Sequence, residues 1–100
     1  SNSEKVKITI LANKYEVKDK FDEIYGVKRN YIAFFSPRNN EIFISVRNTS
    51  IRVLTHEIGH AIAEAYFTPS PAPQVHELIA QYTEKNLYID FQMLSQFLEN

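Results

Sequence analysis

Residues 56–60, which read HEIGH, carry the side chains best suited to chemistry in this chain. In a helix, His56 and His60 are one turn apart and project from nearly the same side, so both imidazoles can reach one ion at about 2.0–2.1 Å. Glu57 lies about 100° round the helix from His56, beside such an ion. The spacing therefore predicts a metal held by His56 and His60, with Glu57 acting as a base on a water molecule that the metal activates.

A catalytic zinc ion usually takes three protein ligands and leaves one position for water. The candidates for the third ligand are His76, Glu77 and Glu84. We favour Glu77, because Ala80 and Gln81 would share its helix face. The small Ala80 would let a second helix approach closely, and Gln81 would accept a hydrogen bond from a ligand imidazole. His76 is the second choice, or else a donor to an oxyanion, and Glu84 is expected to be solvated.

The helix that must carry this motif is expected over residues 51–67, with Thr49 or Ser50 as its N-cap. Gly59 costs this helix about 1 kcal/mol relative to alanine, and a close approach by a neighbouring strand or helix would compensate for that cost. The larger apolar residues form a stripe opposite the histidines, which predicts a core side and a cleft side. This stripe consists of Ile51, Leu54, Ile58, Ile62 and Ala65.

Hydrophobic periodicity and turn signals predict the elements around the motif helix. Apolar and polar residues alternate in the first strand, Gly26 ends the first helix, and a turn-rich stretch joins two apolar runs into a hairpin. Alternate prolines between 68 and 73 predict a rigid loop. The fold class is α+β, with a small antiparallel or mixed sheet packed against three or four helices. The expected strands are 5–10, 31–35 and 41–46, and the further helices are 14–25, 73–87 and a last one that begins at Asp90.

The composition fits one folded domain over residues 1–100, with 44% hydrophobic and 23% charged residues. Because the chain has no cysteine, nitrogen and oxygen must hold any metal. The net charge of -1 gives no case for nucleic acid or an anionic membrane, and the acidic excess in residues 51–100 would favour a cation. Without a signal-peptide pattern or a long apolar run, a cytoplasmic protein is expected. The oligomeric state stays open.

With Glu77 and Ala80 downstream of it, the HEIGH motif resembles the gluzincin branch of the zinc metallopeptidases. In size and motif the chain is similar to the minigluzincins and the ImmA/IrrE-type peptidases. The resemblance spans roughly residues 31–88. Gln81 departs from the pattern, because the larger thermolysin-like enzymes have a carboxylate there, behind a ligand histidine.

This resemblance implies a zincin-like metallopeptidase that hydrolyses peptide bonds in a peptide or protein substrate. One Zn²⁺ per chain would be held by His56, His60 and Glu77, with Glu57 as the general base. In zincin-like proteins an edge strand above the motif helix holds extended peptide, and the segment 41–46 is expected to take this place. Its inward residues would be Ile42, Ile44 and Val46, with Glu41, Phe43 and Ser45 on the outer face.

The residue that stabilises the transition state and the degree of activity remain open. Tyr66, Tyr82 and His76 are candidate donors to an oxyanion. One alternative function is a non-catalytic zinc domain that binds a partner peptide, which a fourth protein ligand would favour. A second alternative is a latent peptidase whose last helix covers the cleft. In that helix Phe91, Leu94, Phe97 and Leu98 share one side.

Overall fold

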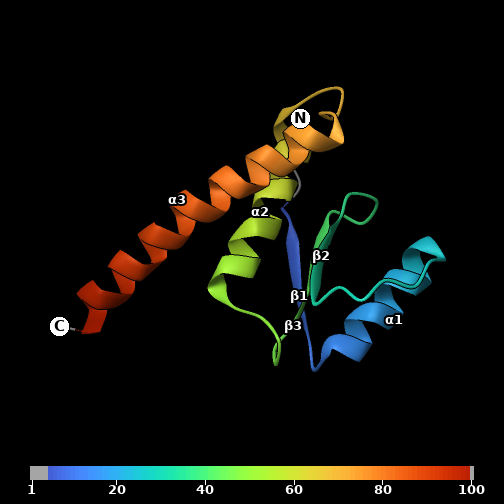
Figure 1. The fold of residues 1–100 in the computed structure, drawn as a ribbon, viewed down its shortest axis with the longest axis horizontal. Coiled ribbons are helices and arrows are strands. Elements are labelled where there is room, and N and C mark those ends of the chain that lie inside the picture. The colour runs from blue at the N-terminus through green and yellow to red at the C-terminus, as the bar shows by residue number, and fades with distance from the viewer. Residues whose placement is uncertain (1–4, 100) are drawn as a thin grey trace.

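The computed structural model describes the backbone of residues 5–99 and the side chains of residues 5–87. It is a small α+β domain of three helices and a three-stranded mixed sheet, which confirms the expected fold class (Figure 1). Helix α1 lies against one side of the sheet, and α2 lies between the other side and α3. In chain order the elements are β1 (Lys7–Leu11), α1 (Lys14–Tyr25), β2 (Ala33–Ser36), β3 (Glu41–Ser45), α2 (Ile51–Tyr66) and α3 (Pro73–Glu99).

The sheet has the strand order β1-β3-β2, so β3 is its central strand. β2 and β3 form the predicted antiparallel hairpin, and β1 pairs with β3 in parallel. The expectation that the segment 41–46 is an edge strand is therefore wrong. The connection through α1 leads from β1 to β2, which leaves the central place in the sheet to β3, and the edge that faces α2 belongs to β2.

Both faces of β3 are buried, which corrects the expected division into an inner and an outer face. Phe43 packs with Val17 of α1 and with Phe34 of β2, whose ring centroid lies 5.1 Å away. Ile42 and Ile44 are buried on the opposite face, the side of the sheet on which α2 lies. Val46, just beyond the strand, is 58% exposed rather than buried.

Local capping explains where the first two helices begin and end. The Asn13 side chain accepts hydrogen bonds from two main-chain N–H groups in the first turn of α1, and Gly26 ends this helix in the left-handed conformation with φ of 71°. The Ser50 hydroxyl accepts from the N–H of Val53 and caps α2, as expected. These residue types satisfy helix ends that would otherwise leave unpaired main-chain groups.

Small side chains pack α2 against α3. Thr55, Gly59 and Ala63 are buried at a spacing of four residues, and a Cβ added to Gly59 would lie only 2.5 Å from Cα of Ala80. The close helix approach expected at Gly59 and Ala80 is thus confirmed. The predicted aliphatic stripe is only partly buried, because Leu54, Ile58 and Ala65 are half-buried while Ile51 and Ile62 are exposed. Ile51 and Leu54 instead line a shallow apolar groove beside β1.

α3 is one continuous helix from residue 73 to 99, not two helices. Residues 74–99 contain neither glycine nor proline, so nothing breaks the helix where Asp90 was expected to start a new one. The predicted apolar face at Phe91, Leu94 and beyond lies outside the side chains described. Among the described residues, no helix is both long enough and apolar enough to span a membrane.

Candidate metal centre

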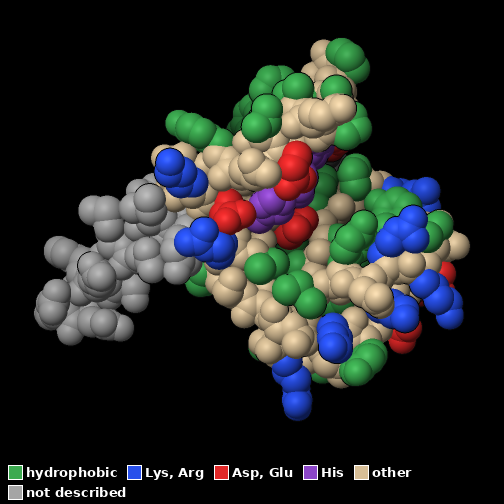
Figure 2. All heavy atoms as spheres, in the orientation of Figure 1, with side chains coloured by type: hydrophobic (Ala, Val, Ile, Leu, Met, Phe, Trp, Pro, Cys, Tyr) green, Lys and Arg blue, Asp and Glu red, His purple; other side chains and the backbone are tan. Residues whose placement is uncertain are grey.

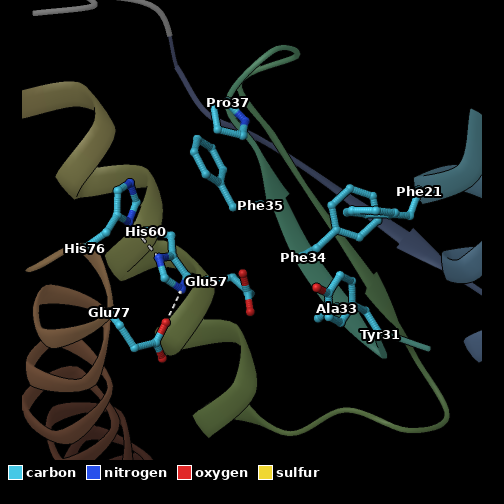
Figure 3. Close-up of a pocket in the computed structure, with 10 residues that line it drawn as sticks. All are labelled: Phe21, Tyr31, Ala33, Phe34, Phe35, Pro37, Glu57, His60, His76 and Glu77. Carbon is cyan, nitrogen blue, oxygen red and sulfur yellow. Dashed lines mark hydrogen bonds and ion pairs between the residues drawn. The ribbon is translucent and has the colours of Figure 1, made fainter. Parts of the chain in front are cut away.

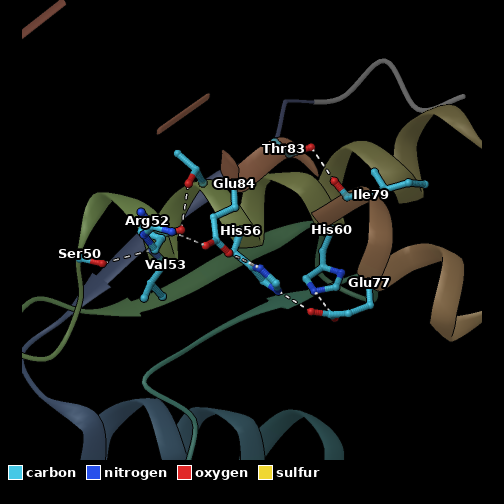
Figure 4. A network of polar contacts seen from close by, with 10 residues as sticks. Ser50, Arg52, Val53, His56, His60, Glu77, Ile79, Thr83 and Glu84 are labelled. Carbon is cyan, nitrogen blue, oxygen red and sulfur yellow. Dashed lines mark hydrogen bonds and ion pairs between the residues drawn. The ribbon is translucent and has the colours of Figure 1, made fainter. Parts of the chain in front are cut away.

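The three predicted ligands come together where α2 crosses α3 (Figure 4). Nε2 of His56 lies 2.9 Å from one carboxylate oxygen of Glu77, and Nε2 of His60 lies 3.3 Å from the other. One ligand atom from each residue lies within 4.8 Å of the other two, which is close enough for a shared ion. Two imidazole nitrogens and one carboxylate oxygen form a donor set that suits zinc.

A second carboxylate, that of Glu84, supports His56 from behind. Nδ1 of His56 lies 2.9 Å from Oε1 of Glu84, and Arg52 donates to Oε2 of the same carboxylate at 3.3 Å. This corrects two expectations. Glu84 is bonded to His56 rather than merely solvated. It also takes the supporting place behind an imidazole that was expected for Gln81, which is exposed. An imidazole whose second nitrogen donates to a carboxylate is fixed in orientation and is a stronger base toward a metal.

His76, the second choice as ligand, lies behind His60. The two Nδ1 atoms are 2.8 Å apart, and Nε2 of His76 lies 3.2 Å from Oε2 of Glu64. Ser70 in turn donates to Oε1 of Glu64 at 2.8 Å. Among the described residues, the group that could share an ion comprises His56, His60 and Glu77, without His76.

Burial lowers the pKa of His60, and the positive potentials of His56 and His76 act in the same direction. The carboxylate of Glu77 opposes this change. A lower pKa favours the neutral imidazole, which is the form that can donate a lone pair to a metal. The surroundings of His60 therefore favour its metal-binding form.

Glu57 does not belong to the group that could share an ion, as its position in the motif predicts. It lies beside His60 and Glu77, as Figure 3 shows. Burial raises the pKa of Glu57, and the charge of Glu77 adds to this rise. His56 and a hydrogen bond from the main-chain N–H of Phe35 act in the opposite direction. A carboxylate whose pKa is raised toward neutrality is suited to exchange a proton with a reacting group.

A cleft of about 360 Å³ opens in front of Glu57, between the motif helix and β2. Figure 2 shows the histidines and several acidic side chains grouped near the middle of this face, with hydrophobic and basic side chains on the side of α1. Tyr66 and Tyr82 are both largely exposed and do not line the cleft. The lining residues are Phe21, Tyr31, Ala33, Phe34, Phe35 and Pro37 on one wall and Glu57, His60, His76 and Glu77 on the other.

The outer edge of β2 faces this cleft, and among the described residues no strand pairs with it. The N–H of Ser45 in β3 donates to the carbonyl of Ile32, so in an antiparallel pair the main-chain groups of Ala33 and Phe35 point away from β3. The hydrogen bond from Phe35 N–H to Glu57 agrees with this direction. The sequence did not identify Ala33, Phe35 or Tyr31 as cleft residues. Their place in the cleft follows from the strand order, which makes β2 the edge strand next to α2 and which a single sequence does not determine.

Comparison of the chain with protein-family models, with curated proteins and with solved structures finds no match. The resemblance to the gluzincins therefore rests on the sequence motif alone.

Proposed function

We propose that this chain is a zincin-like zinc metallopeptidase that hydrolyses peptide bonds. The observation that carries the proposal is the meeting of His56, His60 and Glu77 beside Glu57, at the base of a cleft that one strand edge borders. Three protein donors leave a fourth position of a tetrahedral ion open, as a catalytic zinc site requires. A purely structural zinc site would need a fourth protein ligand, and His76 is engaged with His60 instead.

When bound, zinc would polarise the scissile carbonyl and lower the pKa of a water molecule toward about 7. His56 and His60 would hold the ion through Nε2, each with its other ring nitrogen supported from behind. Glu57 would accept the proton of the attacking water and deliver it to the leaving amine. The Phe35 N–H would keep one oxygen of Glu57 in place while the other faces the cleft.

The substrate would be an extended peptide that adds to the free edge of β2. Ala33 offers an outward N–H and carbonyl, and Phe35 an outward carbonyl, for pairing with a peptide backbone. The Phe35 N–H is already bonded to Glu57. Such pairing recognises the peptide backbone, so side-chain preference would come from Tyr31 and Phe35 in the cleft wall.

The test combines metal analysis with turnover of fluorescein-labelled denatured casein, with and without chelator. We expect one zinc per chain and chelator-sensitive cleavage. Glu57→Gln should keep the zinc and lose cleavage, and Glu77→Ala should lose most of the zinc. Glu23→Gln, an exposed carboxylate of α1, is the matched control and should change neither.

Three results would each contradict a part of the proposal. Equal cleavage by Glu57→Gln would remove Glu57 from the role of base. Stoichiometric zinc without cleavage of casein or of a random peptide library would favour the non-catalytic zinc domain instead. Zinc content unchanged in Glu77→Ala would mean that another residue supplies the third ligand.

A further inference from the structure

Behind the candidate metal centre, His76 and Glu64 form a hydrogen-bonded pair. His76 in turn contacts His60, as Figure 3 shows. We propose that this pair is a positioning device which fixes the tautomer and the ring orientation of His60 as a metal ligand. The proposal rests on the metal-binding role proposed above for His60. It does not depend on whether the bound metal hydrolyses peptides.

The position of the proton on His60 follows from which nitrogen faces the other ligands. Nε2 of His60 points to Glu77 and to the shared position, so it must offer a lone pair to an ion. A neutral imidazole has one N–H, which is then on Nδ1. The Nδ1 atoms of His60 and His76 are 2.8 Å apart, so this N–H of His60 donates to His76.

The same reasoning determines the tautomer of His76. Its Nδ1 accepts from His60, so its own proton is on Nε2. Nε2 of His76 lies 3.2 Å from Oε2 of Glu64, and a carboxylate can only accept. Oε1 of Glu64 accepts from the hydroxyl of Ser70. The ring N–H groups of His60 and His76 therefore both point away from the metal position and toward the carboxylate of Glu64.

Packing restricts the pair to this arrangement. The side chains of His76 and Glu64 are only 17% and 30% exposed, so water has limited access to replace either partner. The rings of His60 and His76 lie with centroids 4.9 Å apart and planes inclined by 33°. The main-chain N–H of His76 is bonded to the carbonyl of Ala72, which anchors this first turn of α3.

The two ligand histidines are thus supported in different ways. His56 donates directly to a carboxylate, that of Glu84. His60 reaches its carboxylate, Glu64, only through a second imidazole. Because His76 must accept on one nitrogen and donate on the other, a side chain that can only donate, or do neither, cannot replace it.

The first test compares two replacements of His76 by zinc affinity, measured by chelator competition. In His76→Gln, the amide oxygen can accept from His60 and the amide nitrogen can donate to Glu64, so zinc affinity should stay within a fewfold of the original. In His76→Leu neither bond can form, and affinity should fall about 10–100-fold. Equal affinities of the two variants would overturn the proposal, provided that circular dichroism shows both to be folded.

The second test needs no substitution. In the zinc-loaded protein, nitrogen-15 correlation spectra of the imidazoles should show His60 protonated on Nδ1 and His76 protonated on Nε2. A His76 protonated on Nδ1, a His76 ligated to zinc, or an unmodified protein that binds no zinc would each overturn the proposal. Zinc binding with the expected tautomers but without casein cleavage would support it while rejecting the peptidase function.

Discussion

Replacing Gly59 by alanine should weaken metal binding through the spacing of two helices, although position 59 is not a ligand. The added Cβ would lie 2.5 Å from Cα of Ala80 and 2.9 Å from Cβ of Thr83. Carbon atoms pack at about 3.5–4.0 Å, so α2 and α3 would have to part by roughly 1 Å. His60 lies on α2 and Glu77 on α3, so this movement would separate the ligands.

Two opposing effects decide the magnitude. Alanine is favoured over glycine by about 1 kcal/mol within a helix. Overpacking of a closely packed core costs about 1–3 kcal/mol, and here the clash is with the backbone of α3, which cannot turn away like a flexible side chain. A clash with the backbone places the cost in the upper part of this range, about 2–3 kcal/mol, so the net free energy of unfolding of the metal-free protein should fall by about 1–2 kcal/mol. Because metal–ligand distances tolerate only about 0.2 Å, zinc affinity should fall about tenfold or more.

The assay pairs urea unfolding of the metal-free protein with chelator competition for zinc. Gly26→Ala is the matched control, because nothing lies within 4 Å of its added Cβ and its φ of +71° alone is unfavourable. This strain should cost about 1–2 kcal/mol of stability without changing zinc affinity. A Gly59→Ala protein that binds zinc as tightly as Gly26→Ala would refute the argument that helix spacing controls the site.

Three further predictions concern single side chains. Glu57→Gln should stabilise the metal-free protein more at about pH 7 than at about pH 4. Because the pKa of Glu57 is raised by folding, its protonated form contributes stability below the unfolded-state pKa, and this contribution is lost as the pH rises through the folded-state pKa. Glutamine stays neutral and has no such loss. Thermal unfolding with chelator measures this, and equal shifts in Tm at both pH values would contradict it. Glu84→Ala should weaken zinc binding about 10–100-fold in chelator competition, because Nδ1 of His56 loses its acceptor; unchanged affinity would mean that Glu84 gives no support. Ser50→Ala should lower the free energy of unfolding by about 1 kcal/mol in urea, because the N–H of Val53 loses its cap; an unchanged urea midpoint would show that the cap contributes nothing.

Much of the fold could be predicted because local signals decide it. Gly26 and Ser50 mark helix ends through their own backbone and side-chain preferences, and alternation marks the strands. The ligand pair on α2 follows from the helical repeat alone. Glu77 could be chosen because Ala80, one turn along, allows the helix approach that brings α3 to the histidines.

The errors arose where contacts between distant elements decide the outcome. Whether β3 lies at the centre or the edge of the sheet depends on whether β1 pairs with β3 or with β2. The residues of β3 themselves do not specify this. Glu84 contacts His56 because α3 runs antiparallel to α2, so a residue two turns after Glu77 meets the N-terminal turns of the motif helix. Reading α2 and α3 together as an antiparallel pair would have predicted this contact.

The hydrogen bond between Glu57 and the Phe35 N–H has a consequence for self-association. An open sheet margin attracts strands from other molecules, and proteins protect such margins with charged side chains placed over them. The carboxylate of Glu57 covers one donor of the outer edge of β2, the N–H of Phe35, and leaves the groups of Ala33 open. A peptide or a second copy that paired with this strand would find the Phe35 N–H already occupied, so its backbone could bond only to the N–H and carbonyl of Ala33 and the carbonyl of Phe35.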